Sequence, residues 1–246
     1  MAAVCPARCA EALLACESRL SQHFVSVCGP VWLFGFGSLL WKMEGSYTRA
    51  EHAVLPGYMR RFYQASPDHR GTPESQGRVA TLVPALRERA RFSAAPFACP
   101  MVRAAVLQWL SEGAPGGGEE EGSEAALEGE DPATQGIAYL LEGATAAEHL
   151  SKLCKREAGG YTAKAVRVVL KGGETVQASC FTGEVGGEFW APGPPQALAE
   201  IISCSAGCSG TNLDYLLKCK DALSALGVTD VALNALVALA LEYASR

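Results

Sequence analysis

The first candidate for chemistry is a loop of small residues at the end of an apolar, aromatic run. The run Val31-Trp-Leu-Phe leads into Gly35-Phe-Gly-Ser38. Backbone N–H groups exposed at a glycine-broken strand end can bind a carboxylate or an oxyanion, and small residues let the ligand approach. The loop is no dinucleotide fingerprint, because Leu40 stands where the third glycine belongs, and a P-loop Gly-Lys pair occurs nowhere. The loop therefore predicts an anion or oxyanion site.

Two other kinds of active site find little support in the sequence. The segment Gly207-Cys-Ser-Gly-Thr211 nearly matches the Gly-x-Ser-x-Gly of a serine hydrolase, but its last glycine comes one place early and no clear strand precedes it. None of the four histidines falls in a zinc-binding spacing: His23, His52, His69 and His149. We therefore expect no metal, no cofactor and no serine nucleophile.

Four longer blocks occur in order along the chain. They are Phe34–Trp41 (FGFGSLLW), the pair Gly57–Gln64 (GYMRRFYQ) and Asp68–Leu82 (DHRGTPESQGRVATL), Arg156–Tyr161 (REAGGY) and Gly207–Leu216 (GCSGTNLDYL). Each resembles a segment of the ChaC-type γ-glutamylcyclotransferases, and the first is similar to that family's Phe-Gly-Tyr-Gly-Ser-Leu signature. One departure is Phe36, which stands where the family has tyrosine and so removes a hydroxyl while leaving the loop backbone in place.

The resemblance implies a reaction and a site. It implies cleavage of glutathione, in which the substrate's own α-amine attacks its γ-carbonyl to release 5-oxoproline and Cys-Gly. Because the nucleophile belongs to the substrate, the enzyme needs only a base, oxyanion donors and a pocket that folds the glutamyl chain. Glu157 is the expected base, and the expected substrate-binding residues are Leu33, Phe34, Gly35, Phe36, Gly37, Ser38 and Leu39.

The position of Glu157 agrees with that role. Thr145-Ala-Ala-Glu148 has the form of a capping box and predicts a helix that ends at Gly159-Gly160. Glu157 would then lie in the last turn, where the negative end of the helix dipole disfavours an ionised carboxylate. Local sequence alone also fits a solvated surface glutamate, and the four ordered blocks decide for catalysis. Glu148, two and a half turns away, is expected to be the cap.

The elements that must position these residues follow from periodicity and turn residues. Strands are expected at Val31–Phe36, Tyr58–Gln64, Arg78–Val83, Gly136–Glu142, Thr162–Leu170 and Thr175–Phe181, the last two joined in a hairpin by Gly172-Gly173. Helices are expected at Pro6–Phe24, from Thr145 to Glu157, and at Gln196–Ser203, Leu213–Leu226 and Val231–Ala244. This order predicts an α+β fold in which a closed or nearly closed mixed β-sheet, a barrel, is covered by helices. By resemblance, residues 31–246 form a γ-glutamylcyclotransferase-like domain behind an N-terminal helical extension, residues 1–30.

Charge singles out one segment of the chain. Eight acidic residues and no Lys or Arg lie between Glu112 and Asp131, and they turn a mildly positive chain into one of net charge −5. We therefore predict a disordered acidic insertion at about 84–132. The remaining basic residues show no dense run with interleaved aromatics, so no nucleic-acid partner is expected.

Hydropathy and cysteine usage indicate where in the cell the protein is expected. No apolar run reaches the eighteen or so residues of a membrane span, so no membrane partner is expected. Ten scattered cysteines without a Cys-x-x-Cys pair read as reduced thiols in a cytoplasmic protein. The leaving group and the oligomeric state are not fixed by sequence. A cyclotransferase for other γ-glutamyl amides and a non-catalytic γ-glutamyl-binding module stay open as alternatives.

Overall fold

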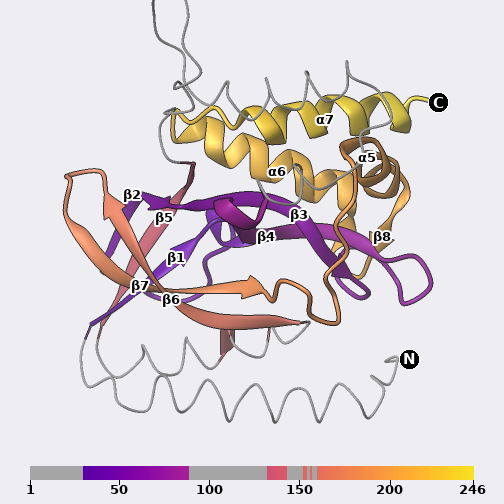
Figure 1. Ribbon diagram of the computed structural model, residues 1–246. Coiled ribbons are helices and arrows are strands. Elements are labelled where there is room, and N and C mark those ends of the chain that lie inside the picture. Colours follow the sequence, from indigo (N-terminus) through magenta and orange to yellow (C-terminus); the bar gives the residue numbers. More distant parts are fainter. Residues whose placement is uncertain (1–29, 89–131, 143–151, 154–155, 157–159) are drawn as a thin grey trace, which may run out of the picture.

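A computed structural model describes five parts of the chain: residues 30–88, 132–142, 152–153, 156 and 160–246 (Figure 1). The expected N-terminal helix, most of the expected acidic insertion and Glu157 itself lie outside these parts. Of the expected insertion, residues 85–88 are described and are helical. Within the described parts, no helix is both long and apolar enough to cross a membrane.

Five strands form a closed barrel. In spatial order they are β1 (Val31–Gly35), β5 (Ala133–Leu141), β2 (Arg49–Pro56), β6 (Tyr161–Leu170) and β7 (Thr175–Gly183). The barrel is mixed, because β1 runs parallel to β7 and antiparallel to β5. The predicted mixed barrel is therefore confirmed. The predicted hairpin is β6–β7, which turns at Gly173 with a positive φ of 85°.

The barrel interior explains why these segments are strands. Side chains alternate between inside and outside along a strand, so every second residue must be apolar. Val166, Val168 and Leu170 of β6 are buried in the main core, while Ala165 and Arg167, at the alternate positions, are exposed. The same core includes Phe34 and Ala53, among other residues of the remaining strands.

A second layer lies beside the barrel (Figure 1). It consists of the hairpin β3 (Tyr58–Ser66) and β4 (Gly77–Pro84) and of three helices, α5 (Pro195–Cys204), α6 (Asn212–Ala225) and α7 (Val231–Ala244). Asp230 caps α7 by accepting a hydrogen bond from the N–H of Leu233 at 3.0 Å. A short hairpin, β8 (Ala206–Gly207) and β9 (Gly210–Thr211), joins α5 to α6.

The free edge of β4 is closed by side chains. This strand pairs only with β3, so the backbone groups on its other edge need partners. The side-chain amide of Asn212, at the start of α6, accepts from the Arg78 N–H at 2.5 Å and donates to the Arg78 carbonyl at 2.7 Å. Further along, the Thr182 hydroxyl of β7 accepts from the Leu82 N–H at 3.0 Å. These contacts attach the β3–β4 hairpin to both helix α6 and the barrel.

A buried ion pair fixes the chain just beyond β4. The Arg61 guanidinium donates to Glu88 Oε1 at 2.7 Å, and the Tyr63 hydroxyl donates to the same oxygen at 2.8 Å. Glu88 is buried together with both partners. Residues 85–88 are therefore held against β3.

The role of Asn212 gives a stability prediction. Asn212→Ala leaves the N–H and the carbonyl of Arg78 without partners at a fully buried position. Each buried unsatisfied group costs about 1–3 kcal/mol, so we expect the free energy of unfolding to fall by about 2–4 kcal/mol. Urea unfolding followed by circular dichroism measures it. The control is Asn234→Ala in α7, a half-buried asparagine that is expected to cost less than about 1 kcal/mol. Equal losses in the two variants would contradict the side-chain closure of β4.

Candidate active site

The loop after β1 doubles back on itself. A 3-10 turn, η1 (Ser38–Leu40), follows Gly35 so closely that a Cβ on Gly35 would lie 2.6 Å from the Leu39 Cβ. A Cβ on Gly37 would lie 3.0 Å from the Tyr215 hydroxyl. Neither glycine has a positive φ. Both are therefore required by close packing and not by backbone conformation.

The carbonyls of this loop are all engaged. The Phe36 carbonyl accepts from Arg60 Nε at 2.9 Å, and the Leu39 carbonyl accepts from the Tyr139 hydroxyl at 2.8 Å. The carbonyls of Gly37 and Ser38 accept from backbone N–H groups of the turn itself. Burial raises the pKa of Tyr139 to about 12, so its hydroxyl remains a donor.

Three N–H groups of the same loop have no hydrogen-bond partner in the described parts of the chain. Among the described residues, no acceptor receives a hydrogen bond from the N–H of Gly37, Ser38 or Leu39. In a trans peptide the C=O and N–H point in opposite directions. Because the Phe36 carbonyl faces Arg60, the Gly37 N–H faces away from Arg60. Successive unpaired N–H groups of this kind form a concavity that attracts negative charge.

The three residues that carry these N–H groups line a cavity. It has an empty volume of about 310 Å³, part of it open to solvent, and is lined by Phe34, Phe36, Gly37, Ser38, Leu39, Ala80, Tyr161, Phe181 and Tyr215. Strand β1 with its loop, strands β4, β6 and β7, and helix α6 all contribute lining residues. The walls are mainly aromatic and aliphatic, and the polar atoms are concentrated on the loop and on two tyrosines. Such a cavity suits a small molecule with an anionic or carbonyl end.

Two tyrosine hydroxyls hold one residue of the cavity wall. The N–H of Ala80 donates to the Tyr215 hydroxyl at 3.2 Å, and the Tyr161 hydroxyl donates to the Ala80 carbonyl at 2.7 Å. Ala80 lies on the free edge of β4 between Arg78 and Leu82. The edge closure described above thus continues into the cavity, where it fixes both tyrosine rings.

Arg60 connects the loop to distant elements. Its guanidinium is buried, with 2% of the side chain exposed, and it donates to Phe36, to the Gln135 carbonyl of β5 and to Asp230 Oδ2 at 2.5 Å. Asp230 is also the cap of α7. Strands β3 and β5, helix α7 and the loop therefore meet at one cation.

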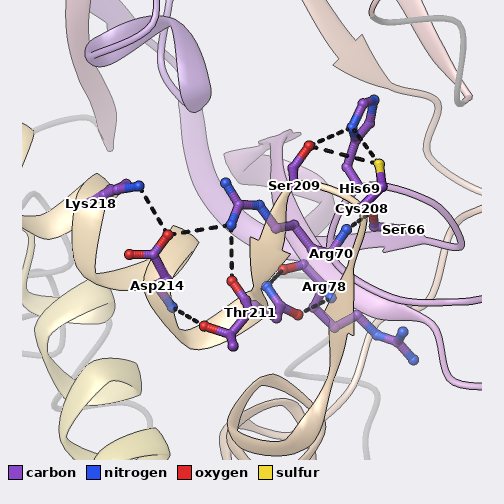
Figure 2. A network of polar contacts seen from close by, with 10 residues as sticks. Ser66, His69, Arg70, Arg78, Cys208, Ser209, Thr211, Asp214 and Lys218 are labelled. Carbon is purple, nitrogen blue, oxygen red and sulfur yellow. Dashed lines mark hydrogen bonds and ion pairs between the residues drawn. The ribbon is translucent and has the colours of Figure 1, made fainter.

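Two of the sequence blocks come together at Arg70, whose guanidinium donates to the Thr211 carbonyl at 3.0 Å (Figure 2). The same guanidinium lies over the Tyr215 ring, 5.3 Å from its centroid. The Asp214 carboxylate forms ion pairs with the Lys218 ammonium group at 3.0 Å and with the Arg70 guanidinium at 3.5 Å. The hydrogen bond from Lys218 is the main reason that the pKa of Asp214 is lowered. The near-match to a serine hydrolase elbow is in fact part of this packing.

The structure brings together most, but not all, of the predicted site residues. Phe34, Phe36, Gly37, Ser38 and Leu39 line the cavity, whereas Leu33 and Gly35 do not. Leu33 is fully buried in a small core cluster, and Gly35 serves the tight turn.

Glu157 lies outside the described residues, but residues before and after it in the sequence are described. Arg156 donates to the Lys42 carbonyl at 3.2 Å and lies 3.7 Å from Glu44, just beyond the loop. On the other side, Tyr161 lines the cavity.

Sequence reasoning missed four lining residues and one positioning residue. Tyr161 and Tyr215 both lie in blocks that resemble the family, and this position was the one sequence feature that pointed to a place in the site. Ala80 and Phe181 carry no chemical signal in a sequence, because their contribution is shape. Arg60 is the positioning residue. No group of three or more His, Cys, Asp or Glu side chains in the described parts could hold a metal ion.

Comparison with known proteins agrees with this architecture. The ChaC-like protein family matches residues 31–243, and the chain belongs to that family. A glutathione-specific gamma-glutamylcyclotransferase of Saccharomyces cerevisiae is 30% identical, covering 87% of this chain and 97% of the yeast protein. Human glutathione-specific gamma-glutamylcyclotransferase 1 is 27% identical, over 80% of this chain and 71% of its own. A crystal structure of the yeast enzyme superposes with a TM-score of 0.71 at 29% identity, covering 87% of this chain and 97% of that one.

The contact between Arg60 and Asp230 gives a second stability prediction. Asp230→Asn keeps a good helix cap but removes the charge that compensates the buried guanidinium. We expect a loss of about 2–4 kcal/mol in the free energy of unfolding, measured by urea titration. Asp221→Asn, an exposed position on α6, is the control and is expected to change stability by less than about 0.5 kcal/mol. A fully stable Asp230→Asn protein would show that the cap alone matters.

Proposed function

We propose that this protein is a γ-glutamylcyclotransferase that cleaves glutathione to 5-oxoproline and Cys-Gly. The observation that carries the proposal is the loop of residues 36–39, whose carbonyls are all bonded while the N–H groups of Gly37, Ser38 and Leu39 have no acceptor in the described parts of the chain. Membership of the ChaC-like family and the names of the yeast and human relatives support the choice of reaction and substrate. Free cysteines at all four described positions fit the proposed cytoplasmic location.

The proposed mechanism transfers two protons from the substrate's α-ammonium group to the departing amine and exchanges one bond. Glu157 takes the first proton from the α-ammonium group, and the freed amine attacks the γ-carbonyl carbon. The carbonyl oxygen becomes an oxyanion that the loop N–H groups stabilise by hydrogen bonds. Glu157 gives its proton to the amide nitrogen, and collapse of the intermediate breaks the amide bond. The ring nitrogen then loses its second proton, which leaves on the ammonium group of Cys-Gly. Atoms and charge balance without water or a cofactor.

The cavity supports this chemistry in two further ways. Its aromatic and aliphatic walls at Phe34, Phe36 and Phe181 leave little room for water around the reacting groups. A five-membered ring can form only if the amine and the γ-carbon meet, so the lining of the cavity must hold the glutamyl chain folded. Arg60 contributes by fixing the peptide whose N–H opens the row of donors.

The test of the function is a substrate panel. Purified protein is incubated with glutathione, γ-glutamyl-alanine and γ-glutamyl-lysine, and 5-oxoproline is measured by chromatography. We expect glutathione to give equal amounts of 5-oxoproline and Cys-Gly. Turnover of the other amides but not of glutathione would move the assignment to a different leaving group. Binding of glutathione without any 5-oxoproline would favour a regulatory module.

The proposed base is tested by Glu157→Gln. The amide keeps the shape of the side chain but cannot carry the proton, so we expect turnover to fall by about 10²–10⁴-fold while glutathione still binds. Binding is measured by isothermal titration calorimetry and turnover by 5-oxoproline release. Glu148→Gln is the matched control, because glutamine also completes a capping box and activity should be nearly normal. Near-normal turnover in Glu157→Gln would contradict the mechanism.

A further inference from the structure

The four described cysteines differ in their surroundings. Cys180 and Cys219 are buried, and burial raises the pKa of each thiol to about 12. Cys204 and Cys208 are exposed. Only the thiolate attacks a disulfide, and it must be accessible. The two buried thiols are therefore inert, and the comparison is between two exposed ones four residues apart.

Cys208 stands beside a histidine (Figure 2). Its Sγ is 3.7 Å from Nδ1 of His69, and the Ser209 hydroxyl is 2.9 Å from the same nitrogen. Asp68 Oδ2 lies 3.8 Å from Nε2 on the other side of the ring. A thiol, an imidazole and a carboxylate in this order form a nucleophile, a base and a group that orients the base.

The backbone builds this arrangement. Cys208 lies at the tip of the β8–β9 hairpin, and its N–H donates to the Asp68 carbonyl at 2.9 Å. The N–H of Ser209 donates to the His69 carbonyl at 3.0 Å. A Cβ on Gly207 would lie 2.3 Å from the Asp68 carbonyl oxygen, so the hairpin packs directly on this loop. Thiol and imidazole are thus neighbours because two chain segments are bonded together.

Cys204 offers an internal comparison. It is the last residue of α5, and its Sγ donates to the Ile201 carbonyl at 3.5 Å within the same helix. Among the described residues no imidazole contacts it. The two thiols therefore share exposure but differ in the presence of a base.

We propose that Cys208 is a site of thiol–disulfide exchange with glutathione disulfide, assisted by His69. The Cys208 proton passes to the imidazole, and the thiolate attacks one sulfur of the small disulfide. A new S–S bond forms between Cys208 and one glutathionyl group while the original S–S bond breaks. The leaving glutathione thiolate takes the proton from His69. One disulfide is consumed and one is formed, so no further oxidant is needed.

This site is separate from the proposed reaction. It uses none of the residues that line the cavity, and it concerns the sulfur of glutathione disulfide and not the γ-glutamyl bond of glutathione. Its test therefore measures covalent modification and gives a result whether or not the protein releases 5-oxoproline.

The experiment follows modification of individual cysteines in the full-length protein. Reduced, desalted protein is mixed with glutathione disulfide, quenched in acid at intervals and digested with trypsin. Cys180, Cys204 and Cys208 fall on one tryptic peptide, so fragmentation in the mass spectrometer must localise the added glutathionyl group. We expect Cys208 to be modified about tenfold faster than Cys204, and Cys180 not at all in the folded protein.

Variants assign the effect to the imidazole. His69→Gln, an exposed substitution, is expected to slow modification of Cys208 to about the rate of Cys204. His52→Gln is the control, because His52 is bonded to Gln135 between two barrel strands and should leave the rate unchanged. Equal rates at Cys204 and Cys208 in the unaltered protein overturn the proposal. So does a His69→Gln protein in which Cys208 reacts as fast as before.

Discussion

A single buried guanidinium sets the direction of the peptide on which the candidate site depends. Arg60 holds the Phe36 carbonyl and thereby turns the next N–H the other way. A lysine could not do this, because one ammonium group cannot reach three acceptors in a fixed planar arrangement. The guanidinium also binds Asp230, whose negative charge compensates its own and lowers the free-energy cost of burying it. The loop that lines the cavity, barrel strand β5 and the cap of the last helix are consequently all bonded to the Arg60 guanidinium.

The cavity is formed where two layers meet. The barrel supplies the loop and Tyr161, and the second layer supplies Ala80 and Tyr215. The Tyr161 hydroxyl joins the two layers at Ala80, and the Tyr215 hydroxyl holds the same residue from within the second layer. The wall of the cavity is therefore held by hydrogen bonds both between the layers and within one of them.

Much of the fold could be predicted, for physical reasons that differ by element. Alternating burial in a barrel leaves a visible pattern in Thr162–Leu170, and the apolar stripe predicts a helix at Val231–Ala244, the bounds that α7 has. The structure adds that Asp230 is the cap of this helix. Strand β2 was missed because Glu51 and His52 interrupt any apolar alternation at its start. Of the seven residues predicted to bind substrate, five line the cavity, whereas Leu33 and Gly35 serve packing. Arg60 could not be found, because its partners are 24, 75 and 170 residues away in sequence.

The side-chain closure of β4 has a consequence for the behaviour of the protein in concentrated solution. A strand edge with unpaired N–H and C=O groups is a template for pairing with another chain. Here that edge is hidden by Asn212, Tyr215 and Thr182, two of which belong to α6. Loss of α6 would remove two of these three side chains and leave the backbone groups of Arg78 and Ala80 free to pair with another chain. The same step would open the main core, to which Leu216, Cys219 and Leu223 of α6 belong. Core opening and self-association of this protein would then be coupled through one helix.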